Sequence, residues 1–201
     1  MILTLSAASS LYWLGRYMLR VEALCQILPF EDESYALAYA NSFSLSAWNI
    51  ETLLLALHDP ERRGSLPNNL AVIQDNIQAV RGILPRQVFE AFNRLWRQRE
   101  QSDACICGLL TEAAAELQQL DSMALVFWQL GRAVESVDMA LRLHEPVQSA
   151  ADQLLQVAQQ LPMPEWQVAV ELVTQLVMQP DVPRLYAVCD RLHLAFVEGS
   201  A

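Results

Sequence analysis

LGRYMLRVE at residues 14–22 and LGRAVESVD at residues 130–138 decide how this chain folds. A shift of 116 residues aligns the two stretches. The matching pairs are Leu14 and Leu130, Gly15 and Gly131, Arg16 and Arg132, Val21 and Val137, and Glu22 and Asp138. Because the match includes a glycine, an arginine and an acid as well as apolar residues, it indicates an internal repeat.

Each stretch belongs to a longer stripe of apolar residues whose positions step by three and four. The first stripe is Leu11, Leu14, Met18, Val21, Cys25 and Leu28, and the second is Met123, Phe127, Leu130, Val134, Val137 and Leu141. This spacing is typical of a helix that packs in a bundle. We therefore predict that both stretches lie on packed helices.

The rest of the chain is also periodic, and prolines separate the periodic segments. The pattern predicts helices at about residues 5–28, 33–57, 66–82, 86–100, 103–119, 122–144, 146–160, 165–178 and 183–197. Alternating strand patterns with hairpin turns are absent from the sequence. We expect an all-α multi-helix bundle built from two pseudo-repeated helical halves. It would form a single domain over residues 1–201, with a first repeat at about 5–119 and a second at about 120–201.

The composition narrows the classes of partner. Apolar residues make up 53% of the 201 residues, and this surplus predicts a large core, a partner interface, or both. The net charge of −10 and the pI near 4.7 argue against binding to nucleic acids or anionic lipid surfaces. Residues 1–10 lack the basic start of a secretory signal, and no span reaches about 18 apolar residues without polar interruption. We expect a cytoplasmic protein with no nucleic-acid partner and no membrane partner.

Metal and cofactor motifs are absent from the sequence. Its four cysteines are Cys25, Cys105, Cys107 and Cys189. Two helical residues spaced like Cys105 and Cys107 point about 200° apart, which is not zinc-ligand spacing. No glycine-rich phosphate loop and no Glu-x-x-His motif occurs. The sequence therefore predicts buried thiols in a reducing compartment, no metal site and no cofactor.

Charged residues interrupt the two apolar helices. They are Arg16, Arg20 and Glu22 on the first, and Arg132, Glu135 and Asp138 on the second. Charges are almost never fully buried unless they are paired. These six residues are thus candidates for a ligand-binding site or for structural ion pairs. No nucleophile with its base can be assigned, and we expect no catalytic residue among them.

The two helices also share a glycine and complement each other in charge. Gly15 and Gly131 lie mid-helix, where a glycine costs about 1 kcal/mol relative to alanine. Their recurrence predicts close packing of another helix at each. The first helix carries Leu19-Arg20 where the second carries Glu135-Ser136. If the two helices face each other, Arg20 can pair with Glu135.

These motifs resemble the bacterial alpha-E domain family. ASSLYWLGRYMLRVEALCQIL at residues 8–28 is similar to its opening helix, and FWQLGRAVESVDMAL at residues 127–141 to its second copy. Each copy keeps half of the family's Glu-Arg pair, Arg20 in the first and Glu135 in the second. Residues 70–93, LAVIQDNIQAVRGILPRQVFEAFN, resemble the family's middle segment. On that likeness the motif positions are Asn76, Val80, Arg81, Glu90 and Asn93. The resemblance covers about residues 7–145.

The resemblance implies an all-helical domain encoded beside, or fused to, a circularly permuted ATP-grasp ligase and a transglutaminase-like protein. It implies a supporting role in an ATP-dependent peptide- or amide-forming system, a form of peptide modification. We therefore predict a non-catalytic or accessory interaction protein whose partner is one or both of those proteins, with a homo-oligomer as a further possibility. The alternative is an enzyme or ligand-binding protein whose Arg/Glu cluster holds a carboxylate- or phosphate-bearing substrate.

Overall fold

The computed structural model describes residues 3–98 and 102–198, and within these ranges it contains ten α-helices and no strand. The helices are α1 (Leu5–Ile27), α2 (Glu33–Ser42), α3 (Ile50–His58), α4 (Leu66–Ala79), α5 (Arg86–Gln98), α6 (Asp103–Leu117), α7 (Ser122–Arg142), α8 (Gln148–Ala158), α9 (Gln167–Met178) and α10 (Val182–Glu198). The predicted all-α class is confirmed. None of the helices in these ranges has both the length and the apolar character needed to cross a bilayer.

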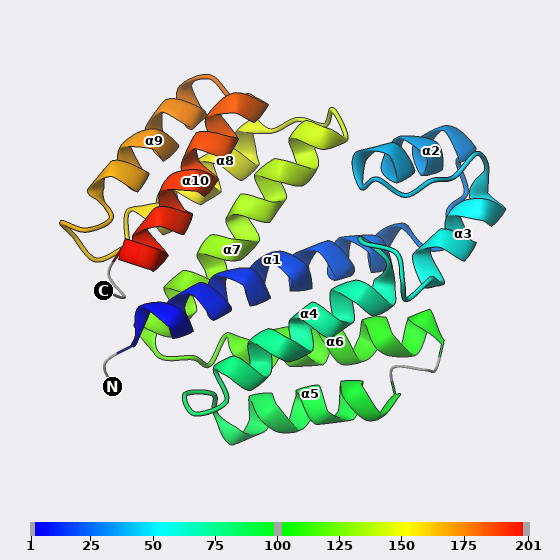
Figure 1. Ribbon diagram of the computed structural model, residues 1–201, viewed down its shortest axis with the longest axis horizontal. Helices are drawn as coiled ribbons and strands as arrows, with labels where there is room; N and C mark the ends of the chain where they lie inside the picture. Colours follow the sequence, from blue (N-terminus) through cyan, green and yellow to red (C-terminus); the bar gives the residue numbers. More distant parts are fainter. Residues whose placement is uncertain (1–2, 99–101, 199–201) are drawn as a thin grey trace.

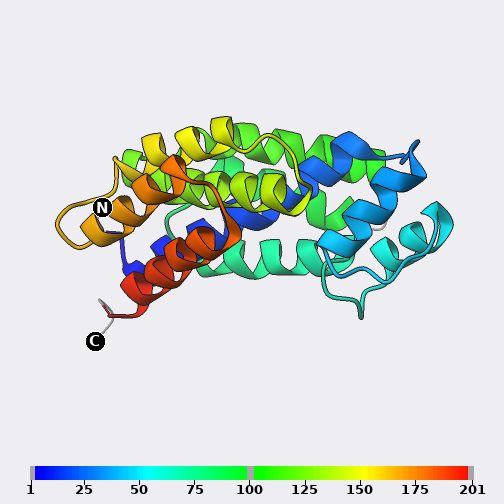
Figure 2. The ribbon, with the colours of Figure 1, turned by 90° about the horizontal axis from the view of Figure 1, so that it is seen from above.

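The two helices that carry the repeated motif form the centre of the molecule (Figure 1). α1 packs against α7, α4 and α6, and α5 lies on α6. On the other side of α7, α8, α9 and α10 follow one another, and α10 returns to contact both α1 and α7. Figures 1 and 2 show α2 and α3 at one end of the molecule, beyond the main bundle. The central positions of both predicted apolar stripes are buried: Leu11, Leu14, Met18 and Val21 on α1, and Phe127, Leu130, Val134 and Val137 on α7.

The single helix predicted over residues 33–57 is wrong, because the chain forms two helices there. α2 ends at Ser42, and the backbone of Ser44 takes a positive φ of 57° that a helix cannot continue through. α3 then starts anew at Asn49, whose side chain accepts a hydrogen bond from the backbone N–H of Thr52. The Thr52 hydroxyl in turn accepts from the Asn49 N–H, which completes a capping box.

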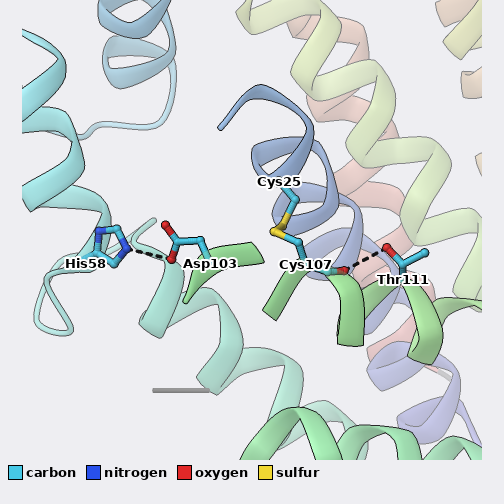
Figure 3. Close-up of a disulfide and its surroundings, with 5 residues drawn as sticks. All are labelled: Cys25, His58, Asp103, Cys107 and Thr111. Atoms are coloured by element: carbon cyan, nitrogen blue, oxygen red, sulfur yellow. Dashed lines mark hydrogen bonds and ion pairs between the residues drawn. A yellow bond between two sulfur atoms is a disulfide. The ribbon is translucent and has the colours of Figure 1, made fainter. Parts of the chain in front are cut away.

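The prediction that the cysteines are all thiols is also wrong. Cys25 on α1 and Cys107 on α6 form a disulfide across 82 residues of sequence, with their Cα atoms 5.7 Å apart (Figure 3). The packing of α6 on α1 brings the two side chains together, and nothing in the local sequence encodes that approach. Cys105 and Cys189 remain thiols, and both are half-buried.

Candidate functional site

The candidate site lies where α1 and α7 cross, and two glycines allow this crossing. A Cβ atom added to Gly15 would lie within 3.0 Å of the carbonyl oxygen of Trp128 on α7. A Cβ atom added to Gly131 would meet the carbonyl group of Tyr12 on α1 in the same way. Each helix therefore places its glycine against the backbone of the other. At such a distance only glycine avoids a clash.

One turn from the glycines, a buried carboxylate joins two arginines. Glu135 on α7 has no exposed surface. Arg16 Nε donates to Glu135 Oε2 at 2.8 Å, and Arg20 Nε donates to Glu135 Oε1 at 2.6 Å. Both oxygens of the carboxylate thus accept from guanidinium groups. Charge-assisted hydrogen bonds of this kind offset the cost of burying the carboxylate.

A second carboxylate extends the network toward the end of α7. Asp138 is buried, and its Oδ2 accepts from Arg16 Nη2 at 3.0 Å. Its Oδ1 accepts from Arg142 Nε at 2.7 Å, and Arg142 Nη1 also donates to the backbone carbonyl of Ser42 at 3.0 Å. The network therefore holds α1, α7 and the end of α2 in fixed relation. We call Arg16, Arg20, Glu135, Asp138 and Arg142 the arginine–acid network.

The remaining two predicted charges form their own pair beside this network. Arg132 on α7 donates from Nη1 and Nη2 to the two carboxylate oxygens of Glu22 on α1, at 2.8 and 2.7 Å. The bidentate geometry is the one that a guanidinium and a carboxylate favour. The Arg132 guanidinium also lies 4.9 Å from the centre of the Trp128 ring. All six charged residues singled out in the sequence thus lie at the α1–α7 contact.

Two groups beside Arg16 can be considered as nucleophiles. Arg16 Nη1 lies 3.5 Å from the Tyr12 hydroxyl and 4.0 Å from Cys189 Sγ. Burial raises the pKa of both the Tyr12 phenol and the Cys189 thiol, although the charge of Arg16 opposes the rise. Both groups therefore stay protonated near neutral pH and are poor nucleophiles.

The geometry suits holding a ligand better than transferring a proton. Glu135, Asp138 and Glu22 already accept from guanidinium groups, so none is free to act as a general base. No group of three or more His, Cys, Asp or Glu side chains in the described part of the chain is placed to hold a metal ion. The arginines, in contrast, keep N–H groups beyond those that the acids use.

The motif positions of the middle segment lie apart from this network. Asn76 donates to the backbone carbonyl of Val72 within α4, and Glu90 accepts from Arg86 within α5. Arg81 follows α4, with its guanidinium 5.3 Å from the centre of the Phe89 ring. Asn93 lies on α5. No hydrogen bond or ion pair within the described residues joins these four motif residues to the arginine–acid network.

Arg142 is a member of the network that was not among the charged residues singled out in the sequence. It is the last residue of α7 and pairs with Asp138 four positions earlier. Acid and base four residues apart on a helix share a face, so this spacing was a usable signal. The contact with the carbonyl of Ser42, by comparison, depends on where α2 ends.

Comparison with protein families agrees with the all-helical fold. The model of the Alpha-E family, described as a predicted alpha-helical domain with a conserved ER motif, matches residues 5–184. This chain belongs to the Alpha-E family. Arg20 and Glu135, the residues that the sequence comparison placed in the two halves of the Glu-Arg motif, form the 2.6 Å ion pair between α1 and α7. Searches of curated proteins and of solved structures gave no match to this Alpha-E chain.

Proposed function

We propose that this Alpha-E protein is a non-catalytic accessory protein that binds an ATP-grasp-type ligase of a peptide- or amide-forming system. The observation that carries the proposal is an exposed apolar face on α10. The acids of the arginine–acid network are all occupied, which favours a binding role over a catalytic one. Membership of the Alpha-E family supports the choice of partner class.

The face comprises Val182, Tyr186, Leu194 and Val197, whose residues are between 39% and 55% exposed. At roughly 100° per residue, these four positions fall within a sector of about 120° on one side of α10. Asp190 and His193 share that sector and are also exposed. Apolar and aromatic side chains among a few polar ones are typical of a partner interface.

Co-elution of the purified protein with an ATP-grasp ligase of the class that the family resemblance implies tests the proposal. We expect a complex in size-exclusion chromatography, and we expect Tyr186→Glu with Leu194→Arg to abolish it. Trp48→Ser is the matched control, because Trp48 is also exposed but lies near α3 at the other end of the molecule. Absence of a complex with the unaltered chain, or equal loss with the control, would contradict the proposal. Self-association lost through the same α10 variant would assign the face to a homo-oligomer instead.

A single domain made of two related halves, at about 5–119 and 120–201, is part of the proposal. The reciprocal contacts of Gly15 and Gly131 support it, because each repeat contributes the same residue to the crossing. Separate expression of the two halves tests it. We expect neither half to fold alone, because the Arg20–Glu135 pair and the main core contact both cross the boundary.

A cytoplasmic location also remains part of the proposal. Disulfides are rare in reducing compartments, so the Cys25–Cys107 bond makes the location testable. Alkylation of thiols at the moment of cell lysis, followed by mass spectrometry, reports the state of the pair. Two alkylated thiols at these positions would support the cytoplasm and would mean that the bond forms only after lysis, whereas a bonded pair in the cell contradicts the cytoplasmic location.

A further inference from the structure

A cavity of about 440 Å³ opens beside the arginine–acid network, apart from the face on α10. It lies among the C-terminal half of α1, the end of α7, the chain that follows α2, and the start of α4, toward the end of the molecule where α2 and α3 lie (Figure 1). Its lining includes Tyr17, Arg20, Phe43, Arg63, Asn68 and Arg142. Three of its lining side chains are arginines, and none is acidic.

The positive charge at this cavity is not balanced by the protein. The arginine–acid network joins three arginines to two carboxylates, which leaves one positive charge in excess. Arg63 adds another, because it has no ion-pair partner within the described residues and lies in the turn before α4. The cavity therefore faces a surplus of two positive charges. In a chain of net charge −10, this local excess is a specific feature.

Two of the three guanidinium groups are held in place before any ligand binds. Arg20 uses Nε for Glu135, and its guanidinium lies 5.1 and 5.6 Å from the ring centres of Tyr17 and Phe43. Arg142 uses Nε for Asp138 and Nη1 for a backbone carbonyl. Both Nη groups of Arg20 and the Nη2 group of Arg142 therefore remain for a ligand. Donors that are already oriented lower the entropy cost of binding.

The start of α4 adds to the attraction for an anion. Asn68 and Asn69, in the first turn of this 14-residue helix, line the cavity. The N-terminus of a helix carries a partial positive charge. The Asn69 side chain itself adds nothing to this attraction, because its Nδ2 donates to the carbonyl of Gly64 and its Oδ1 can only accept a hydrogen bond.

We infer that this cavity binds a small organic anion with two negative charges, a dicarboxylate or a phosphate monoester. Guanidinium groups bind both kinds of oxyanion bidentately. The charge of the ligand would match the surplus of two, and a volume of about 440 Å³ accommodates a small organic molecule. Arg20, Arg63 and Arg142 would hold its oxygens.

A larger cavity of about 960 Å³ does not offer the same chemistry. It is lined mostly by apolar residues, together with His58 and Asp103. His58 Nε2 lies 3.0 Å from Asp103 Oδ1 (Figure 3). Its Nδ1 lies 2.8 Å from the carbonyl oxygen of Leu54. Asp103 is the one carboxylate among the described residues that line this cavity, and none of them is an arginine or a lysine, so the cavity presents no positive excess that would select an anion.

Titration calorimetry on the full chain at fixed ionic strength tests the inference. The probes are glutarate, inorganic phosphate and acetate. We expect glutarate or phosphate to bind at least tenfold more tightly than acetate, and the tighter of the two identifies the class of ligand. Failure of both dianions to bind at millimolar concentration would overturn the inference, as would equal affinity for acetate.

Arg63→Met and Arg62→Met form the matched pair of variants. Arg63 lines the cavity, whereas Arg62 lies next to it in the same turn, points its Nε at Asp59 at 3.6 Å and does not line the cavity. We expect about tenfold weaker binding for Arg63→Met and less than a twofold change in affinity for Arg62→Met. The Tm of Arg63→Met should stay unchanged, because the Arg63 side chain is exposed. Equal losses would show that only the overall charge matters and would refute the site. Binding by Leu194→Ser, a change without charge on the α10 face, should match that of the unaltered chain, which separates this site from the partner face.

Discussion

Replacing Gly15 with alanine adds one methyl group at the tightest contact between α1 and α7. Its Cβ would lie within 3.0 Å of the Trp128 carbonyl oxygen and 3.0 Å from Arg132 N, where an ordinary contact is 3.4–4 Å. Both are backbone atoms of α7, so no side chain can rotate to relieve the clash and the helices must separate. Overpacking of a core costs about 1–3 kcal/mol, and this site belongs at the upper end. Alanine regains about 1 kcal/mol of helix propensity. The net loss in unfolding free energy is thus about 2 kcal/mol.

Thermal and urea unfolding measure this loss, with Gly108→Ala as the control. Gly108 lies within α6, and a Cβ there would meet nothing within 4 Å. We expect Gly15→Ala to lower the Tm by about 4–8 °C and Gly108→Ala to raise it by about 2–4 °C, for a chain of this length. Both variants replace a glycine with alanine. Changes in Tm of opposite sign would therefore show that the loss of stability comes from the close contact between α1 and α7. A Gly15→Ala protein as stable as Gly108→Ala would refute the close contact.

Three other perturbations follow from the same structure. In a double-mutant cycle, Arg20→Met and Glu135→Gln should show a coupling of about 1–3 kcal/mol in unfolding free energy, and zero coupling would mean that the pair contributes nothing. Reduction of the Cys25–Cys107 disulfide should lower the unfolding free energy by about 2–4 kcal/mol, and thiol titration of the denatured protein should count two thiols before reduction and four after it. The pKa of His58 is raised from 6.5 by its hydrogen bonds to a backbone carbonyl and then to a carboxylate. Its protonated form therefore adds stability that is fully present below pH 6.5 and is lost as the pH rises through the folded-state pKa. Because the His58 side chain is half-exposed, His58→Gln should lower the unfolding free energy by less than about 1 kcal/mol. This loss should shrink between pH 6 and pH 9. A loss that does not change with pH would show that protonation of His58 has no part in stability.

Sequence periodicity was sufficient for the helices but not for every boundary. The stripes through Leu14 and Leu130 predicted packed helices, because a spacing of three and four residues is a local property of the chain. The break between α2 and α3 escaped prediction, since apolar residues recur along the whole of segment 33–57 and no proline or glycine interrupts it. Ser44 and the cap at Asn49 decide it, and both signals are weaker than the hydrophobic pattern around them.

For the site, the sequence determined which residues need partners. Arg16, Arg20 and Glu135 lie on apolar helices, and the cost of an unpaired buried charge implied that each would find a counter-charge. The complementary half-motifs also specified the Arg20–Glu135 pair, provided that the two helices meet.

Only the tertiary structure decided which groups converge from distant parts of the chain. Arg63 reaches the same cavity as Arg20 and Arg142 because the turn before α4 lies beside the C-terminal half of α1 and the end of α7. The Cys25–Cys107 bond depends in the same way on the packing of α6 against α1. The local sequence determines which face of a helix is apolar, because the hydrophobic pattern repeats every three or four residues. Distances between faces depend on how whole helices pack, and no short stretch of sequence contains that information.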